Sequence, residues 1–188
     1  MAHTEQGNFC KSLKLKFKDY FINKRVLEIG SYNVNGTIRD LFENCDYIGV
    51  DIAPGNCVDV VSKAHEYKSD ELFDVVCSCE MLEHDMYLDL SLKNMVNLLK
   101  PNGLFFFTCA TENRAEHGTI NRNQGDSPLT TQIDVWKTYY KNVSEQDIRN
   151  ILDLESIFVS YRFEFAKHED MYFWGIKNSV NNLNYDLF

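Results

Sequence analysis

The sequence lacks long apolar runs. No stretch approaches the roughly 20 apolar residues that a membrane-spanning helix needs. The first 24 residues also contain no uninterrupted apolar segment of the kind that a signal peptide carries. We therefore expect no membrane partner and a cytoplasmic location.

Proline and glycine are scarce, with 3 prolines and 9 glycines among 188 residues. No repeat, low-complexity tract or linker divides the chain. A length of 188 residues is that of one domain, and a hydrophobic content of 44% is enough for a core. We predict a single domain over 1–188, whose N-terminal segment, 1–24, precedes the first strand.

The cysteines lack the spacing of a metal site. No CxxC pair combines with a histidine pair in the way that is typical of zinc sites, so the sequence predicts no metal. Most cysteines lie in or beside apolar runs, which favours reduced thiols in the core. The six cysteines are Cys10, Cys45, Cys57, Cys77, Cys79 and Cys109.

Positive charge is also in short supply. The chain has 19 Lys and Arg against 28 Asp and Glu, which gives a formal net charge of −9. Proteins that bind nucleic acid usually present a basic face, so we do not expect nucleic acid as a partner. The one basic cluster, which a docked protein or RNA substrate would have to use, is Lys11, Lys14, Lys16 and Lys18.

Short apolar runs alternate with segments of helical periodicity. The runs have the length of buried parallel strands, and they are 25–29, 47–51, 73–79 and 104–109. Helical spacing occurs at 37–43 and 88–99, and a Lys-Pro-Asn-Gly turn at 100–103 follows the second helix. This order predicts an α/β fold with a doubly wound, Rossmann-like parallel sheet and helices on both faces.

The last third of the chain has a different pattern. Ser144, followed by acidic residues, predicts the N-cap of a helix over 144–154. Two aromatic and β-branched runs, 156–165 and 171–177, are separated by a charged turn and predict a hairpin. We therefore expect an antiparallel C-terminal pair at one edge of the sheet.

Polar residues end the first two predicted strands. In open α/β sheets a ligand lies at the carboxyl ends of the strands, normally beside the first one. Gly30 there allows close backbone approach, and Asp51 can accept two hydrogen bonds from ribose hydroxyls, although taken alone it could equally cap a helix. Because Ser31 and Tyr32 follow Gly30, the GxGxxG fingerprint of nicotinamide dehydrogenases is absent. The pattern indicates a nucleoside site.

Four motifs resemble those of the class I S-adenosylmethionine-dependent methyltransferases. They are VLEIG at 26–30, YIGVD at 47–51, FDVV with CEMLEH at 73–84, and LKPNGLFFFT at 99–108. They occur in that family's order and spacing, and the resemblance extends from about residue 25 to the terminal hairpin. The chain resembles a small single-domain member, which implies S-adenosylmethionine as the cofactor and methyl transfer as the activity.

The resemblance also implies which residues bind the cofactor. Glu28, Gly30, Ser31 and Tyr32 would flank its methionine part, and Asp51, with Ile52 beside it, would bind the ribose. Lys63, Ala64 and His65 would lie against the adenine, and Cys79, Glu80 and Met81 would close over the cofactor. The family often has an acid at the position of Lys63, so here the adenine would be recognised by backbone atoms.

Histidines follow the fourth and fifth runs. Methyl transfer is an in-line displacement that requires positioning and exclusion of water. A hydroxyl acceptor gains from a base with a pKa near the working pH, for which histidine is suited. We therefore take His84 and His117 as catalytic candidates, with oxygen slightly preferred over nitrogen as the accepting atom.

A long polar stretch, 108–140, leaves the site end of a predicted strand. Such loops are usually functional, so we interpret it as an acceptor-side loop or lid, the alternative being a solvated surface loop. Its arginines could pair with an anionic acceptor, and Trp136 could belong to a lid or to the core. The candidate substrate-binding residues are Arg114, Glu116, Arg122, Tyr139 and Tyr140.

The cofactor sheet and its hairpin take up most of the chain, which leaves little for acceptor recognition. This favours a small-molecule acceptor, such as a sugar or another metabolite, or a site completed by a second subunit in a homo-oligomer. Two alternatives stay open: a methyltransferase that acts on protein or RNA, and a non-catalytic, cofactor-binding partner subunit.

Overall fold

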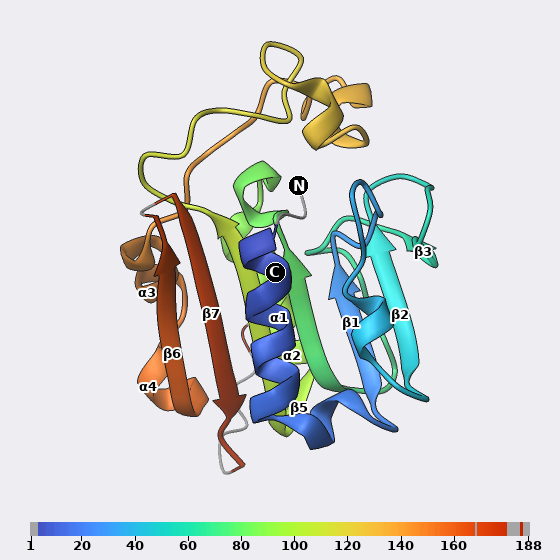
Figure 1. The fold of residues 1–188 in the computed structure, drawn as a ribbon, viewed down its shortest axis with the longest axis vertical. Coiled ribbons are helices and arrows are strands. Elements are labelled where there is room, and N and C mark those ends of the chain that lie inside the picture. The colour runs from blue at the N-terminus through green and yellow to red at the C-terminus, as the bar shows by residue number, and fades with distance from the viewer. Residues whose placement is uncertain (1–3, 168, 180–184, 186–188) are drawn as a thin grey trace.

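A seven-stranded sheet forms the centre of the molecule (Figure 1). The computed structural model describes residues 4–167, 169–179 and 185. The other residues of the domain predicted over 1–188 lie outside the described ranges. The strand order is β3-β2-β1-β4-β5-β7-β6. The strands are β1 (Arg25–Ile29), β2 (Asp46–Asp51), β3 (Val60–Val61), β4 (Phe73–Cys79), β5 (Leu99–Ala110), β6 (Phe158–Ala166) and β7 (Asp170–Lys177).

Strand direction confirms the predicted fold class. The neighbours β3, β2, β1, β4 and β5 pair in parallel, whereas β7 pairs antiparallel with both β5 and β6. The predicted C-terminal hairpin is therefore present at one edge of a Rossmann-like sheet. Since β1 lies between β2 and β4, the strand order reverses beside it, and this is where such sheets bind ligands.

Helices cover both faces of the sheet, as predicted. Figure 1 shows α1 (Thr4–Lys16) across one face, with α2 (Leu88–Leu98) behind the sheet. Two further helices, α3 (Glu145–Ile151) and α4 (Leu154–Ile157), precede the hairpin. The 3-10 turns are η1 (Lys18–Phe21), η2 (Arg39–Leu41), η3 (Leu82–His84), η4 (Gln124–Asp126) and η5 (Thr130–Gln132).

Alternate side chains of the central strands face opposite layers of the core. Leu104 and Phe106 of β5 belong to the cluster beneath α1, whereas Phe105 and Phe107 belong to the cluster beneath α2. All four are fully buried. Because successive strand residues point to opposite faces, only an uninterrupted apolar run can fill two layers, and this run is what predicted the strand.

The N-terminal segment contains a helix that the sequence analysis did not predict. Phe9, Cys10 and Leu13 of α1 are buried against the sheet at helical spacing. Two of its lysines are engaged within the chain: Lys14 Nζ donates to the Leu41 carbonyl oxygen at 2.6 Å, and Lys16 Nζ lies 3.7 Å from the centre of the Trp174 ring.

The predicted helix over 37–43 is wrong. Only η2 forms there, and none of its three residues is buried. The residue before it, Ile38, provides no capping side chain, and Phe42 is already extended. The Arg39 side chain instead forms an ion pair with Asp59, and this stretch remains an irregular connection between β1 and β2. Seven residues without a cap or a buried stripe do not sustain a helix.

The predicted turn at 100–103 also differs. It is a bulge inside β5, which starts at Leu99, and the pairing with β4 shifts register between Phe73 and Val75. Asn102 adopts a left-handed conformation with φ of 59°. The helix predicted at 144–154 is confirmed in its N-terminal part, where Ser144 and Asp147 form a capping box, but it ends at Ile151.

All six cysteines are free thiols. Within the described ranges, no helix combines the length and apolar character that crossing a membrane requires.

Candidate active site

A cavity of about 490 Å³ lies at the carboxyl ends of β1, β2 and β4. Figure 1 shows the segment after β5, drawn in yellow, passing above these strand ends. That segment adds Asp126–Thr130 and Trp136 to the cavity wall, and the start of α1 adds Thr4, Gly7 and Lys11. The predicted cofactor residues that line the cavity are Glu28, Gly30, Ser31, Tyr32, Asp51, Ile52, Lys63, Ala64, Cys79, Glu80 and Met81.

The loop after β1 packs tightly between neighbouring strands. Gly30 and Ser31 donate their backbone N–H groups to the Val50 carbonyl oxygen at 2.8 and 3.2 Å. Gly30 has φ of 81°, and a Cβ atom added there would lie 2.5 Å from Cβ of Met81. Any side chain at this position would therefore be strained and would collide with Met81, just after β4, so the backbone approach requires glycine.

The carboxylate of Asp51 ties the first two strand ends together. Its Oδ2 accepts the Tyr32 N–H at 2.9 Å, and its Oδ1 accepts the Ile52 N–H at 2.7 Å. Burial raises the pKa of Asp51, and the two backbone hydrogen bonds oppose that rise. No helix follows this residue, so Asp51 is not a helix cap. Each oxygen keeps a lone pair for a further donor, such as a hydroxyl group in the cavity.

Glu28 is a buried acid in the cavity wall. Its Oε2 accepts a hydrogen bond from the Tyr47 hydroxyl at 2.8 Å. Burial raises the pKa of Glu28 to about 7, although the Tyr47 hydrogen bond and the Arg39 charge lower it. Its charge therefore changes near neutral pH, and a cation in the cavity would favour its ionised form.

Residues 62–65 border the cavity only in part. Ser62 donates its backbone N–H to the Asp51 carbonyl oxygen at 2.9 Å, and Lys63 forms an ion pair with Glu66. Lys63 and Ala64 line the cavity, whereas His65 does not. The His65 ring lies against Tyr87, with ring centres 4.3 Å apart.

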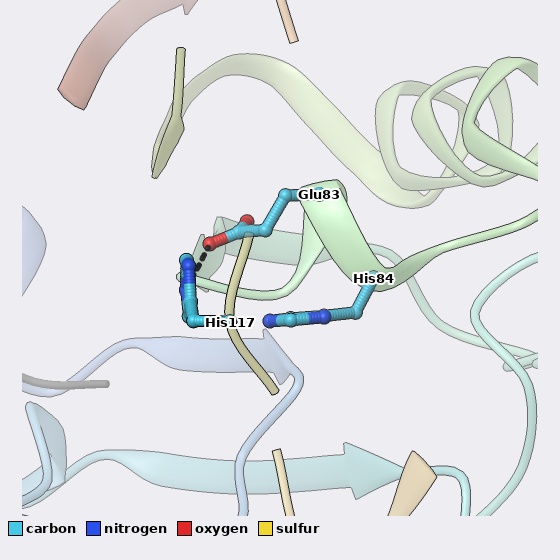
Figure 2. A group of neighbouring side chains, drawn as sticks. All are labelled: Glu83, His84 and His117. Carbon is cyan, nitrogen blue, oxygen red and sulfur yellow. Dashed lines mark ion pairs between the residues drawn. The ribbon is translucent and has the colours of Figure 1, made fainter. Parts of the chain in front are cut away.

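Three buried side chains meet beside the cavity, and we call Glu83, His84 and His117 the Glu–His–His cluster (Figure 2). Glu83 and His84 come from η3, and His117 comes from the segment after β5. One potential ligand atom from each residue lies within 4.8 Å of the other two. Only His84 also lines the cavity.

Several polar atoms of this cluster are unsatisfied within the part of the chain that the structure describes. Neither carboxylate oxygen of Glu83 and neither ring nitrogen of His84 has a hydrogen-bond partner among the described residues. Burial raises the pKa of Glu83 and lowers the pKa of His84 to about 3. Burial also lowers the pKa of His117. Leaving such groups unsatisfied is costly, so a ligand for them is expected.

The predicted substrate-binding residues do not line the cavity. Arg114 Nη1 lies 3.5 Å from Asp170 Oδ1, and Glu116 accepts a hydrogen bond from Thr119. Arg122 is exposed and Tyr139 is half-buried. The Tyr140 ring lies beside the two histidines of the Glu–His–His cluster, with ring centres 5.6 and 5.0 Å away.

Other residues of the same segments line the cavity instead. Trp136, which the sequence allowed in a lid or in the core, lines the cavity and is buried. Leu129 is also buried within the polar stretch 108–140, and this contrast in polarity is a signal that could have identified it. Thr4, Gly7 and Lys11 share one face of α1 through their spacing of three and four residues. Predicting that helix would have placed them together.

Residues 1–153 match the family model described as a methyltransferase domain. No curated protein matches the chain by sequence. Among solved structures, the N-methyltransferase NodS from Bradyrhizobium japonicum WM9 is similar, with a TM-score of 0.58 and 17% identity; the match covers 93% of this chain and 95% of that one.

Two further solved structures contain bound molecules. The 1,6-didemethyltoxoflavin-N1-methyltransferase of Burkholderia thailandensis, with 1,6-didemethyltoxoflavin and S-adenosylhomocysteine bound, has a TM-score of 0.62 and 14% identity; coverage is 92% of this chain and 78% of that one. Phosphoethanolamine N-methyltransferase 2 of Haemonchus contortus, in complex with phosphomonomethylethanolamine and S-adenosylhomocysteine, has a TM-score of 0.61 and 17% identity. This match covers 91% of the present chain and 52% of the Haemonchus chain.

Proposed function

The chain belongs to the methyltransferase-domain family, and from this premise we propose that it transfers the methyl group of S-adenosylmethionine to the oxygen of a small-molecule acceptor. It is an enzyme, and S-adenosylmethionine is its cofactor. What we propose is that the acceptor is a sugar or another metabolite and that an oxygen atom accepts the methyl group.

One observation carries the placement of the cofactor. The Gly30–Tyr32 loop, Asp51 and the end of β4 line a single cavity at the point where the strand order reverses. In this proposal Asp51 binds the ribose hydroxyls while its two backbone hydrogen bonds hold it in place. Glu28 lies in the cavity wall, where its ionised form would offset the positive charge of the cofactor.

The size and enclosure of the cavity support a small acceptor. Its volume falls within the roughly 300–1,000 Å³ range of small-molecule sites. The chain's own residues 126–130 and Trp136 form part of its wall, which favours a small acceptor over completion of the site by a second copy. Lys14 and Lys16 are engaged within the chain, so the N-terminal basic cluster gives little support to a protein or RNA substrate.

His84 supports oxygen as the accepting atom. It is the cluster histidine that lines the cavity, and its ring nitrogens are unpartnered in the described part of the chain, so it can accept a hydrogen bond from an acceptor hydroxyl. In this proposal the His84 ring accepts that hydrogen bond in its neutral form, because its pKa of about 3 lies well below the near-neutral value expected of a general base, and His117 beside it is a positioning residue. Nitrogen is the second candidate because the three similar structures described above are all named N-methyltransferases, and two of them hold a small molecule beside S-adenosylhomocysteine.

Binding of S-adenosylhomocysteine to D51A tests the cofactor site. Loss of the ribose hydrogen bonds should weaken binding by about 1–3 kcal/mol, measured by isothermal titration calorimetry. The matched control is D46A, at the opposite end of the same strand, which should bind as the wild type does. Equal affinity of D51A and the wild type would remove Asp51 from the site.

The acceptor can be identified by turnover. Metabolite extracts incubated with isotopically labelled S-adenosylmethionine should yield a labelled product, whose mass spectrum identifies the methylated atom. An O-methylated product is expected. An N-methylated product would contradict the choice of oxygen, and a labelled protein or RNA in place of a metabolite would contradict the small acceptor.

A further inference from the structure

The Glu–His–His cluster has the composition and geometry of a metal site. Its members are at most 4% exposed, and Figure 2 shows the three side chains turned toward one another. Because one ligand atom from each lies within 4.8 Å of the others, an ion between them could reach normal coordination distances with shifts below about 1 Å.

A hydrogen bond outside the cluster fixes which atom of His117 faces inward. His117 Nδ1 lies 3.1 Å from the Ala115 carbonyl oxygen. A carbonyl only accepts, so Nδ1 carries the proton and the neutral ring presents the lone pair of Nε2 to the cluster. Metal-bound histidines are oriented by this type of backbone contact.

The gap between His117 and Glu83 fits an ion better than a hydrogen bond. His117 Nε2 lies 3.8 Å from Glu83 Oε1, too far for a hydrogen bond and with two electron-rich atoms face to face. Two ligands of one ion, each about 2.0–2.2 Å from it, lie about 3.0–3.6 Å apart. Both oxygens of Glu83 and both ring nitrogens of His84 are without hydrogen-bond partners within the described ranges.

We propose that Glu83, His84 and His117 bind one divalent transition-metal ion, with an open coordination position toward the cavity. Two imidazoles and one carboxylate favour zinc and its neighbours over magnesium or calcium, which prefer oxygen ligands. Three protein ligands and one free position are the pattern of catalytic rather than structural sites. His84 belongs both to the cluster and to the cavity wall, so the open position faces the cavity.

A metal at this place specifies the acceptor further, and this step rests on the proposed function. With the ion bound, His84 would act as a ligand instead of accepting the hydroxyl hydrogen bond directly. An acceptor hydroxyl that binds at the open position would have a lower pKa and release its proton to solvent. Its oxygen then forms a bond to the methyl carbon while the carbon–sulfur bond breaks. The electron pair of that bond stays on sulfur, and the products are the methyl ether and S-adenosylhomocysteine. The acceptor class is therefore a hydroxyl-bearing small molecule.

Metal titration of the full chain tests the site. Protein freed of metal by a chelator should bind one Zn²⁺ per chain in calorimetry, and Co²⁺ should give the visible absorption of a bound ion. E83Q and H117Q each remove one ligand and should weaken Zn²⁺ binding at least about tenfold. E112Q is the matched control for E83Q, because Glu112 is exposed and lies outside the cluster, and it should bind Zn²⁺ as the wild type does.

The outcomes separate the metal site from the proposed function. Each variant is also titrated with S-adenosylhomocysteine, which verifies that it is folded and that its cofactor site is intact. Wild type that binds S-adenosylhomocysteine but not Zn²⁺, or equal Zn²⁺ binding by the wild type, E83Q and H117Q, overturns the metal site and leaves the methyltransferase. Zn²⁺ binding that E83Q and H117Q lose supports the site, even where no acceptor is found.

Discussion

Glu28 is a side chain whose ionisation is coupled to folding. Its pKa of about 7 in the folded chain, raised mainly by burial, lies above its ordinary value of 4.5. Between these two values the folded state binds more protons than the unfolded state. The free energy of unfolding therefore falls as the pH rises from about 4.5 to 7, by about 3 kcal/mol in total, and stays low above it.

E28Q should remove this pH dependence. Glutamine keeps the shape of the side chain and can accept the Tyr47 hydrogen bond, but it does not titrate. Urea unfolding at pH 5 and pH 8 should give a smaller difference for E28Q than for the wild type, by roughly 2–3 kcal/mol. E112Q, at an exposed glutamate, is the control and should match the wild type. An unchanged difference in E28Q would mean that Glu28 ionises freely in the folded protein.

Single residues at strand ends were predictable because their role follows from the backbone. Gly30 and Asp51 sit where any sheet of this type exposes its ligand edge, and the sequence shows both strands clearly. Arg114 and Arg122 were predicted to bind the acceptor but do not line the cavity. The orientation of a loop side chain depends on contacts with residues that are distant in the sequence. Arg114 faces Asp170, a neighbour that local sequence does not reveal.

At the scale of elements, β7 supports the end of α2. Lys177 Nζ donates to the carbonyl oxygens of Val96 and Leu99, at 2.7 and 2.8 Å. A helix leaves its last carbonyl groups without partners, and a cation there also interacts favourably with the helix dipole. Lys177 is buried, so water cannot replace it.

K177M should therefore destabilise the protein. Methionine fills a similar volume but leaves the two carbonyl groups unpaired, at a cost of about 1–3 kcal/mol in the free energy of unfolding. K137M removes an exposed ion pair with Asp134 and serves as the control, with an expected cost of about 0–1 kcal/mol. Chemical denaturation measures both. If the two variants lose equal stability, Lys177 contributes no more than a surface charge.

Elements with two buried faces were predictable, and those held by distant contacts were not. The strands β1, β4 and β5 are apolar runs whose residues are mostly buried. The stretch 37–43 has helical periodicity, but Arg39 binds Asp59 and Phe42 stacks on Phe21, so tertiary contacts outweigh a weak local preference. The two-residue β3 is too short to leave a pattern.

At the scale of the whole molecule, six separate parts of the chain converge on the cavity. They are the start of α1, the loop after β1, the end of β2, residues 62–64, the end of β4 with η3, and the segment at 126–136. The β6–β7 hairpin lies at the far edge of the sheet from β1 (Figure 1). The fold therefore places the cavity at the carboxyl ends of central strands and the hairpin at a lateral edge of the sheet.

Hydrogen exchange should reveal this division. Saturating S-adenosylhomocysteine should slow exchange in residues 30–36, 62–64 and 79–85, because a bound ligand stabilises the folded state that it contacts. Amides of β6 should exchange at the same rate with and without ligand. Protection confined to the hairpin, with none at the three segments, would contradict the placement of the cofactor.

The two tryptophans give the protein a built-in optical reporter. Trp136 is in the wall of the cavity, whereas Trp174 of β7 lies beneath Lys16 on the face covered by α1. Emission from the Trp136 indole therefore responds to whatever fills the cavity, whereas the Trp174 indole lies outside the cavity wall and adds a background signal. With Trp174 replaced by phenylalanine, fluorescence alone would follow occupancy of the site in real time, without a label.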